Sequence, residues 1–405
     1  MMKQDYSQIR KLLDEVKIPK LKPVSQIFPR EKEIPIKEAL LREFSSQTAK
    51  ILFRPKMKIA IAVGSRGIRN IDSIVAQVVT NLKRLNVDPF IIPAMGSHGG
   101  ATSEGQVEIL ASLGVTEKFC KAPICATMDT VEVGRTKSGV PVFINKMAVE
   151  EADGVFLINR IKPHTAFSGK FESGLVKMGS VGLGNQLGAK AFHSRGLMHM
   201  ETNLIEMSEV AFSTNSIIGG LAIVENAYDE TAILRLLSKQ EIIEEEPALL
   251  KISRENMPRI KYDNIDVLIV EEIGKDISGD GMDPNITGRF YSPFVDVSEK
   301  IKIQRIVALD LTEESHGNSI GIGVADVISK TLFEKIHLPD MYMNALTNCV
   351  LEPAKLPLIM ESEEEAIKTA IVTCIGVNKE NLKIVRIKNT LSLDKIFVSE
   401  ALFNK

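Results

Sequence analysis

The sequence predicts an α/β protein of two domains, each with a Rossmann-like, mostly parallel sheet flanked by helices, and with the active-site cleft between the domains. Three observations lead to this prediction. Short apolar, β-branched runs alternate with segments of helical periodicity. Most runs end in glycine or polar residues, where an open α/β sheet binds its ligands. The length of 405 residues suits more than one domain, at ~100–200 residues each.

The strands and helices are expected in a βαβ order. "KIAIAVGSRG" (58–67) predicts a strand that ends in glycine, and "IDSIVAQVVTNLKRLN" predicts the helix after it. "PFIIPAMGSHGG" and the helix start "TSEGQVEILASLG" repeat the alternation. Later parallel strands are expected at 154–160, 217–225, 265–274 and 303–311. Near the end, Ser362 is a plausible N-cap for a helix with acids in its first turn.

A domain boundary is predicted near residue 260. The segment 236–264 is highly charged, contains Pro247 and Pro258, and separates two groups of predicted strands. We therefore expect an N-terminal domain of residues 1–260, which carries the candidate catalytic groups, and a C-terminal α/β domain of residues 261–405, which contributes substrate contacts.

The overall charge disfavours nucleic acid and membrane surfaces as partners. Lys and Arg number 50 against 52 Asp and Glu, a formal net charge of −2. The first sixteen residues have mixed charge and no apolar run of a secretory signal, so the expected location is cytoplasmic. Small molecules are the expected partners, and a homodimer is the one macromolecular assembly considered. The four cysteines form no CxxC pair and are expected to be reduced structural thiols: Cys120, Cys125, Cys349 and Cys374.

Potentially catalytic groups gather in three glycine-rich stretches after predicted strands. "VGSRGIRN" carries Arg66 and Arg69, whose guanidinium groups suit phosphate or carboxylate. "GSHGG" carries His98, an imidazole suited to proton transfer near neutral pH. The stretch 159–196 carries His164 and His193, whose spacing fits no zinc motif. Neither a GxGxxG fingerprint nor a Walker lysine accompanies these stretches.

In this order and spacing, the three stretches resemble the nickel-dependent lactate racemase family, a superfamily of 2-hydroxyacid racemases and epimerases. "VGSRGIR" is similar to the family's first-strand loop and "GSHGG" to its Gly-Ser/Thr-His loop. "PHTAFSGKFESGLVK", followed by His193, is similar to its series of His, Gly-rich loop, Lys and His. The resemblance spans most of the chain. It implies a nickel-pincer nucleotide cofactor, pyridinium-3-thioamide-5-thiocarboxylic acid mononucleotide, whose nickel is bound by two sulfurs, one ring carbon and one protein histidine.

The resemblance also implies a role for each candidate residue. His193 would be the nickel ligand, and His98 and His164 would be the acid/base pair on the two faces of the substrate. Lys177 would be linked to the thioamide arm of the cofactor, with Lys170 as the competing lysine. Three further residues would hold the phosphate end of the cofactor: Arg69, Ser168 and Gly169.

Substrate contacts are expected at three more positions. Lys275, in "EEIGKDIS", resembles the family's second-domain lysine before an aspartate and is the candidate for the substrate carboxylate. His316, which lies among acids and glycines in "DLTEESHGNSIGIG", is expected to line the pocket. Arg66 stands where the family's best-known members have an acidic residue, so contacts there are expected to differ. His199 and His337 are expected to be structural or surface residues.

The function that the resemblance implies is racemisation or epimerisation of a 2-hydroxyacid by reversible, proton-coupled hydride transfer to the cofactor. Two bases are needed because the two enantiomers present their hydroxyls on opposite sides. A protein that binds the cofactor or another phosphorylated ligand without isomerising a hydroxyacid is the alternative, as is a metal-dependent enzyme of another reaction class on the same fold. A cofactor carrier has no use for both His98 and His164 in one pocket. Their presence together therefore favours the racemase over the carrier.

Overall fold

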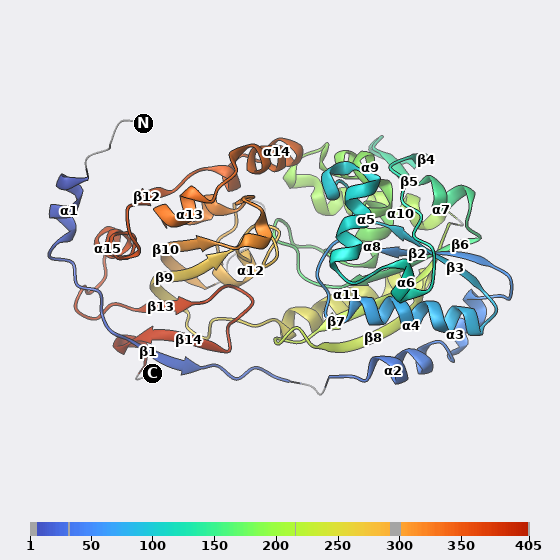
Figure 1. The fold of residues 1–405 in the computed structure, drawn as a ribbon, viewed down its shortest axis with the longest axis horizontal. Coiled ribbons are helices and arrows are strands. Elements are labelled where there is room, and N and C mark those ends of the chain that lie inside the picture. The colour runs from blue at the N-terminus through green and yellow to red at the C-terminus, as the bar shows by residue number, and fades with distance from the viewer. Residues whose placement is uncertain (1–5, 31–32, 215, 292–300, 404–405) are drawn as a thin grey trace. The chain divides into compact units, whose positions relative to one another are not determined.

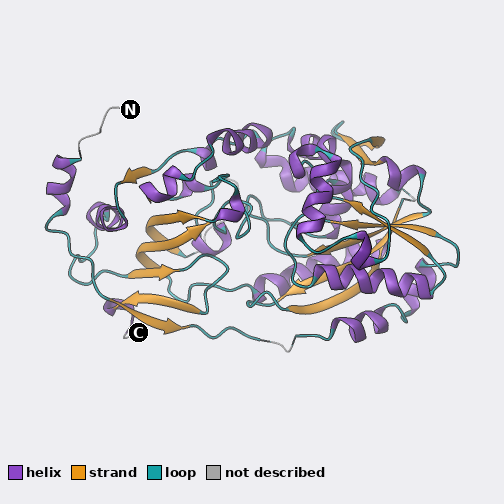
Figure 2. Cartoon of the chain, viewed as in Figure 1, coloured by secondary structure: helices purple, strands orange, loops and turns teal. Residues whose placement is uncertain are grey.

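The computed structural model describes residues 6–30, 33–214, 216–291 and 301–403. Two units make up the chain: Pro29–Met257, and Met1–Phe28 together with Pro258–Lys405. In both units the strands lie among helices (Figures 1 and 2), and most neighbouring strands are parallel. The predicted α/β class with mostly parallel sheets flanked by helices is therefore confirmed.

The unit Pro29–Met257 is built on a five-stranded sheet in the order β3-β2-β6-β7-β8, whose last strand is antiparallel to its neighbour. A separate hairpin pairs β4 with β5. The strands are β2 (Lys58–Val63), β3 (Asp88–Pro93), β4 (Thr130–Arg135), β5 (Pro141–Asn145), β6 (Gly154–Arg160), β7 (Ile217–Glu225) and β8 (Thr231–Ser238). The helices are α2 (Ile36–Glu43), α3 (Gln47–Leu52), α4 (Ile71–Arg84), α5 (Ser103–Ser112), α6 (Glu117–Cys120), α7 (Lys146–Glu150), α8 (Leu175–Ser180), α9 (Asn185–His193), α10 (Met200–Ser213) and α11 (Lys239–Asn256).

Side-chain size differs between the two faces of this sheet. Large side chains such as Ile61 and Phe156 point to the face where they join one core with residues of α2, α3, α4 and α5. The opposite face includes small residues such as Gly220, where an added Cβ would lie 3.1 Å from Leu175 of α8. Both faces are buried, which explains why these strands read as continuous apolar runs.

The other unit has a seven-stranded sheet in the order β1-β14-β13-β9-β10-β11-β12, parallel except for the pairings of β14 with β1 and β13. Its strands are β1 (Leu21–Ser25), β9 (Asn264–Ile273), β10 (Lys302–Leu311), β11 (Val327–Ser329), β12 (Leu358–Met360), β13 (Ile384–Ile387) and β14 (Lys395–Ser399). Its helices are α1 (Ser7–Leu13), α12 (Pro284–Thr287), α13 (Lys330–Glu334), α14 (Leu338–Asn348), α15 (Glu363–Thr373) and α16 (Glu400–Phe403).

The predicted domain of residues 1–260 needs a correction at its start, because the first 28 residues belong to the other unit. β1 pairs with β14 along its whole length, and the Gln26 side-chain amide donates to Leu393 O at 2.7 Å. Leu13 of α1 packs in the core of that unit. The later boundary lies between Met257 and Pro258, directly after α11. The charged segment 236–264 is thus largely the helix α11.

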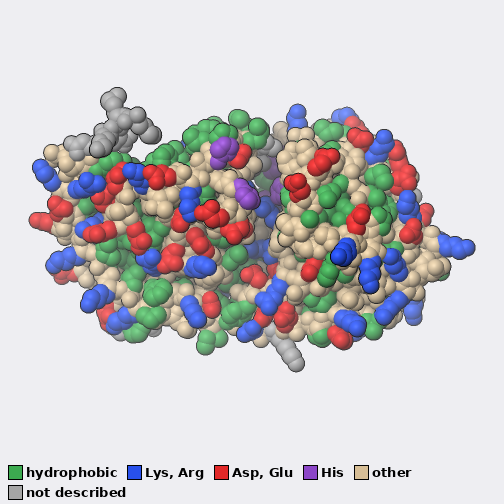
Figure 3. All heavy atoms as spheres, in the orientation of Figure 1, with side chains coloured by type: hydrophobic (Ala, Val, Ile, Leu, Met, Phe, Trp, Pro, Cys, Tyr) green, Lys and Arg blue, Asp and Glu red, His purple; other side chains and the backbone are tan. Residues whose placement is uncertain are grey.

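Acidic and basic side chains intermingle over the face of the molecule drawn in Figure 3. Such a surface gives no extended field of one sign on that face. In the part of the chain that the structure describes, no helix is long and apolar enough to cross a membrane.

Candidate functional site

The candidate site lies at the carboxyl ends of β2, β3 and β6. β3 follows β2 in the chain but lies on one side of it, while β6 lies on the other side, so the strand order reverses between β2 and β6. Loops diverge at such a switch point, and open α/β sheets bind ligands there. The loop after β2 carries Arg66 and Arg69, the loop after β3 carries His98, and the loop after β6 carries His164.

His164 and Lys177 form the central contact of the site, with His164 Nε2 2.5 Å from Lys177 Nζ. Ala166 donates its backbone N–H to His164 Nδ1 at 3.0 Å, so the lone pair of the neutral ring lies on Nδ1 and its proton on Nε2. An Nε2–H group donates, and the amine must therefore accept with its own lone pair. This hydrogen-bond pattern assigns Lys177 the acceptor role, which only the uncharged amine can fill.

The surroundings of His164 keep its imidazole neutral. Burial is the largest cause that lowers the pKa of His164 well below its ordinary value, and an ammonium form of Lys177 would lower it further. His193 and Arg66 act in the same direction, which places both near this ring. Phe167 stacks at a tilt against His164, with 4.5 Å between ring centroids, and gives the site an apolar wall.

His193 is the last residue of α9 and is partly buried. Burial, and then Lys177, lower the pKa of His193 to about 4, so its imidazole is neutral near pH 7 and keeps a lone pair for a ligand. Lys177 Nζ lies 5.6 Å from the centroid of the neighbouring Phe192 ring. His164, Lys177 and His193 thus belong to one cluster, although their positions span three separate elements.

His98 reaches the same edge of the sheet from β3. Its Nδ1 is hydrogen-bonded to Ser65 Oγ in the loop after β2, and its side of the loop is exposed. Gly96 N–H donates to Gly182 O at 3.2 Å, and a Cβ at Gly96 would lie 3.6 Å from Ala189 of α9. The loop of His98 is therefore packed on the helix that ends in His193.

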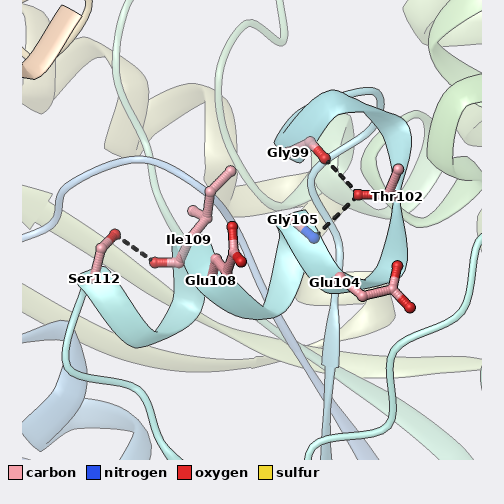
Figure 4. Close-up of a pocket in the computed structure, with 7 residues that line it drawn as sticks. All are labelled: Gly99, Thr102, Glu104, Gly105, Glu108, Ile109 and Ser112. Carbon is pink, nitrogen blue, oxygen red and sulfur yellow. Dashed lines mark hydrogen bonds between the residues drawn. The ribbon is translucent and has the colours of Figure 1, made fainter. Parts of the chain in front are cut away.

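A surface pocket lies next to this loop, on α5 (Figure 4). Thr102 Oγ1 donates to Gly99 O and accepts the N–H of Gly105. A Cβ on Gly99 would come within 2.5 Å of the Gly105 backbone, so the loop needs glycine there. The pocket is lined by Gly99, Thr102, Glu104, Gly105, Glu108, Ile109 and Ser112. None of the predicted site residues lines it, and its hydrogen bonds serve to hold the loop on α5.

Arg69 contacts two acidic side chains. Its backbone N–H donates to Glu225 Oε1 at 2.9 Å, and its guanidinium Nε lies 3.4 Å from Glu33 Oε1. Gly169 donates its N–H to a different carboxylate, Glu172 Oε1, at 3.1 Å, and Ser168 is exposed. Within the described ranges, no hydrogen bond joins Arg69 to Ser168 or Gly169. The structure does not bring the three predicted phosphate contacts into direct contact.

The two candidate lysines have different environments. Lys177 contacts His164, whereas Lys170 is exposed and lies over the ring of Phe171, 5.0 Å from its centroid. The Lys170 backbone N–H donates to Glu201 Oε1 at 3.0 Å. Of the two, Lys177 is the lysine that shares the histidine cluster.

Sequence reasoning missed Glu172, Ser65 and Glu246, which all support the cluster. Glu172 is 1% exposed and accepts the N–H of His164 at 2.6 Å. Glu172 could have been found from the sequence, because it is an acid inside the glycine-rich run "SGKFESG". Glu246 lies in the run "EEEP", whose composition suggests a solvated helix face, yet it is fully buried.

Lys275 and His316 belong to the other unit, where the loops after β9 and β10 meet. Lys275 N–H donates to Ser315 Oγ at 2.8 Å, and its Nζ donates to Gly279 O at 2.8 Å. His316 is exposed and has a left-handed backbone, with φ of 48°. The order of this sheet reverses between β9 and β13, so Lys275 follows a strand at a switch point as well.

No three His, Cys, Asp or Glu side chains among the described residues converge as a set of metal ligands. The thiols include Cys120, whose pKa burial raises to about 11, and no described cysteine is in a disulfide. A metal at His193 would therefore take its remaining donors from a bound cofactor or from solvent.

Comparison with known proteins identifies a family domain and a similar fold. The family description "Lactate racemase N-terminal domain" matches residues 6–202. The fold is similar to that of the lactate racemase apoprotein from Thermoanaerobacterium thermosaccharolyticum, with a TM-score of 0.57 and 13% sequence identity over 89% of this chain and 93% of that chain. No curated protein matches the sequence. Residues 6–202 therefore match the N-terminal domain of the lactate racemase family, and the fold over most of the chain is similar to that of a lactate racemase.

Proposed function

We propose that the protein is a racemase or epimerase of a 2-hydroxyacid that works with a nickel-pincer nucleotide. Family and fold support a racemase-like isomerase. The observation that carries the finer proposal is the contact between His164 and an uncharged Lys177, beside a neutral His193, at the switch point of the sheet. One imidazole for a metal, one amine for a covalent link and one imidazole for proton transfer stand together there.

The residues present fit this cofactor. A nickel ion that receives soft sulfur donors from its own cofactor needs a neutral imidazole from the protein, and His193 has that form near pH 7. An uncharged Lys177 has the lone pair that bond formation with the cofactor's acyl arm requires.

When bound, the cofactor supplies the acceptor and donor for the hydride of the substrate Cα. His98 and His164 would hold the proton of the 2-hydroxyl, one on each side of the substrate. Ser65 fixes the orientation of the His98 ring, and Ala166 fixes that of His164. Loss of the hydroxyl proton together with the Cα hydride would leave a planar keto acid, which could regain hydride on either face.

The anion contacts remain predictions. Arg66, beside His164, is suited to a substrate carboxylate. Ser168 has an exposed hydroxyl for a phosphate, but a phosphate at Gly169 would have to compete with Glu172 for the same N–H. Roles for Arg69, Lys275 and His316 rest on the sequence.

The test is to co-express the chain with the enzymes that make the cofactor, to measure bound nickel, and to screen 2-hydroxyacids for racemisation by chiral chromatography. We expect nickel in the wild type and its loss in His193→Ala, with His199→Ala as the control. Nickel without racemisation of any hydroxyacid would favour the carrier alternative. Racemisation by a metal-free protein would remove the cofactor from the proposal.

The two-base assignment has its own test. His98→Ala and His164→Ala should each lower racemisation by ~10²–10⁴-fold, the usual effect of losing a positioned acid or base. In a single turnover, each variant should still convert one enantiomer, and not the other, to enzyme-bound keto acid, which is quantified after acid quench. The two variants should select opposite enantiomers. Equal conversion of both enantiomers by both variants would contradict two-base catalysis.

A further inference from the structure

Helix α11 packs against the elements that carry the candidate site. It packs against α8, which carries Lys177, and against β7. Two of its polar side chains, Glu246 and Arg254, extend from the helix toward the segment that carries the site. They lie eight positions apart, roughly 12 Å along the helix axis. Pro247 follows Glu246 inside the helix, where it removes one backbone hydrogen bond.

Glu246 holds the start of α8. Its Oε2 accepts the backbone N–H groups of Leu175 at 2.9 Å and Val176 at 3.0 Å, the first two residues of that helix. Such N–H groups have no partner inside their own helix, and here the cap comes from a distant helix. A Cβ on Gly174 would lie 2.2 Å from Glu246 Oε1, so the contact depends on glycine at this position. Lys177 is the next residue of the same turn.

Arg254 reaches His164 through Glu172. Arg254 Nη2 donates to Glu172 Oε1 at 2.6 Å, and Glu172 Oε2 accepts the N–H of His164 at 2.6 Å. Glu172 is almost fully buried, so its charge needs these donors. Two side chains of α11 therefore support the His164–Lys177 pair. Glu246 caps the helix that carries Lys177, and Arg254 binds the Glu172 carboxylate that accepts the His164 N–H.

We infer that Glu246 is a positioning residue that acts through α8 to place the Lys177 amine on His164 Nε2, and that Arg254 does the same for His164 through Glu172. The inference rests on the proposed function only where it predicts an effect on turnover. The geometry itself concerns the protein without cofactor.

Glu246 acts as a hydrogen-bond acceptor and its charge is not required. Its Oε1 is buried and has no hydrogen-bond partner within the described residues. Burial raises the pKa of Glu246 to about 8, against the smaller lowering effect of the Val176 and Leu175 N–H groups. The carboxyl is then protonated near pH 7, with Oε2 as the carbonyl oxygen that accepts both N–H groups. A glutamine side chain has the same shape and the same acceptor.

The experiment measures Lys177 in the purified chain without cofactor. Trinitrobenzenesulfonate labels uncharged amines, and peptide mass spectrometry gives the rate at each lysine. We expect Glu246→Gln to label Lys177 within about twofold of wild type, and Glu246→Met, which has similar length but no acceptor, to label it about tenfold more slowly near pH 7, since a displaced amine returns to the ammonium form. Glu244→Met, an exposed position on the same helix, is the matched control and should match wild type.

Arg254→Met gives a second, independent arm, because the Arg254 side chain is 47% exposed and its replacement leaves the core intact. We expect a shifted His164 Cε1–H resonance by NMR and slower labelling of Lys177, with partial rescue by Arg254→Lys. If Glu246 and Arg254 only stabilise the fold, their replacement would lower the free energy of unfolding. The labelling rate of Lys177 and the His164 resonance of the folded protein would then keep their wild-type values. That result, in Arg254→Met and in whichever Glu246 variant folds, would overturn the inference.

Turnover separates this inference from the proposed function. In a chain loaded with cofactor, Glu246→Met should lower kcat and leave KM within about twofold, because substrate contacts are kept while the reacting pair is displaced. If neither the wild type nor any variant racemises a hydroxyacid, the proposed function fails. The labelling and NMR results still decide the inference about α11.

Discussion

At the scale of single residues, the chemistry of the site depends on where a few protons lie. The backbone N–H of Ala166 occupies one ring nitrogen of His164 and thereby fixes the proton on the other. Lys177 must then be the acceptor of that proton's hydrogen bond. A lysine held as an amine is a nucleophile, whereas a surface lysine near pH 7 is almost entirely an ammonium ion.

We therefore expect Lys177 to react unusually fast. Near pH 7, trinitrobenzenesulfonate should label Lys177 at least about tenfold faster than the exposed Lys170. His164→Phe removes the donor and should bring Lys177 down to the rate of Lys170. Equal rates at the two lysines of the wild type would contradict the hydrogen-bond assignment.

His193 predicts a pH dependence of stability. Its pKa is about 4 in the folded chain and ~6.5 in an unfolded one. Between these values the unfolded state binds the proton and the folded state does not. The contribution of His193 to the free energy of unfolding is therefore fully present above about pH 6.5. It is lost as the pH falls toward 4, and the loss is on the order of 2–3 kcal/mol. Urea unfolding at several pH values should show a smaller acid loss in His193→Asn than in wild type.

The control for this titration is His199→Asn, which removes a histidine near the start of the neighbouring helix α10 and should keep the wild-type pH dependence. An identical acid loss in His193→Asn and wild type would mean that His193 titrates normally in the folded protein.

At the scale of elements, caps and close approaches fix where helices begin. Ser362 caps α15 by accepting the N–H of Glu365 at 3.1 Å, as its position before three acidic residues suggested. Local chemistry was enough there, because a cap is made within four residues. The cap of α8 could not be found in this way, since its acceptor, Glu246, is supplied from another helix.

Ser362→Ala should destabilise the unit that contains α15 by about 1 kcal/mol, the typical cost of losing a serine cap. Chemical denaturation followed by circular dichroism would measure the change. Thr80→Ala is a suitable control: its hydroxyl donates to Ala76 O within α4 and caps no helix end, so we expect a change within about 0.5 kcal/mol. A destabilisation no larger than that of the control would contradict the cap's contribution.

At the scale of the whole molecule, the first 28 residues complete a sheet whose other strands begin after residue 258. β1 covers the edge of β14 and α1 packs against α15. A bare strand edge and an uncovered apolar surface destabilise a sheet and favour aggregation.

Removal of residues 1–28 should therefore destabilise the unit of Pro258–Lys405 and leave the unit of Pro29–Met257 unchanged. Hydrogen exchange read by mass spectrometry can assign protection to each unit separately. We expect faster exchange in β14 and α15, and wild-type exchange in β2 and β6. A peptide of residues 1–28, added in trans, should restore part of the protection. Unchanged exchange in β14 after truncation would show that β1 contributes little.

The sequence by itself determined the α/β class, the strands β2, β3, β6, β7, β9 and β10, and the loops in which the candidate groups lie. These features depend on local patterns: apolar runs of strand length, glycine after a strand, and histidine or arginine among small residues. The match to the lactate racemase family was also visible from the order and spacing of those motifs, and the comparisons confirm it.

Tertiary structure alone decided which of these groups meet and in which protonation state. The lowered pKa values of His164 and His193, the contact of Lys177 with His164 and the burial of Glu172 and Glu246 arise from contacts between residues far apart in the chain. The placement of the first 28 residues has the same origin, because β1 pairs with a strand more than 350 positions later. Desolvation and hydrogen bonding act through space, and a sequence pattern records only neighbours along the chain.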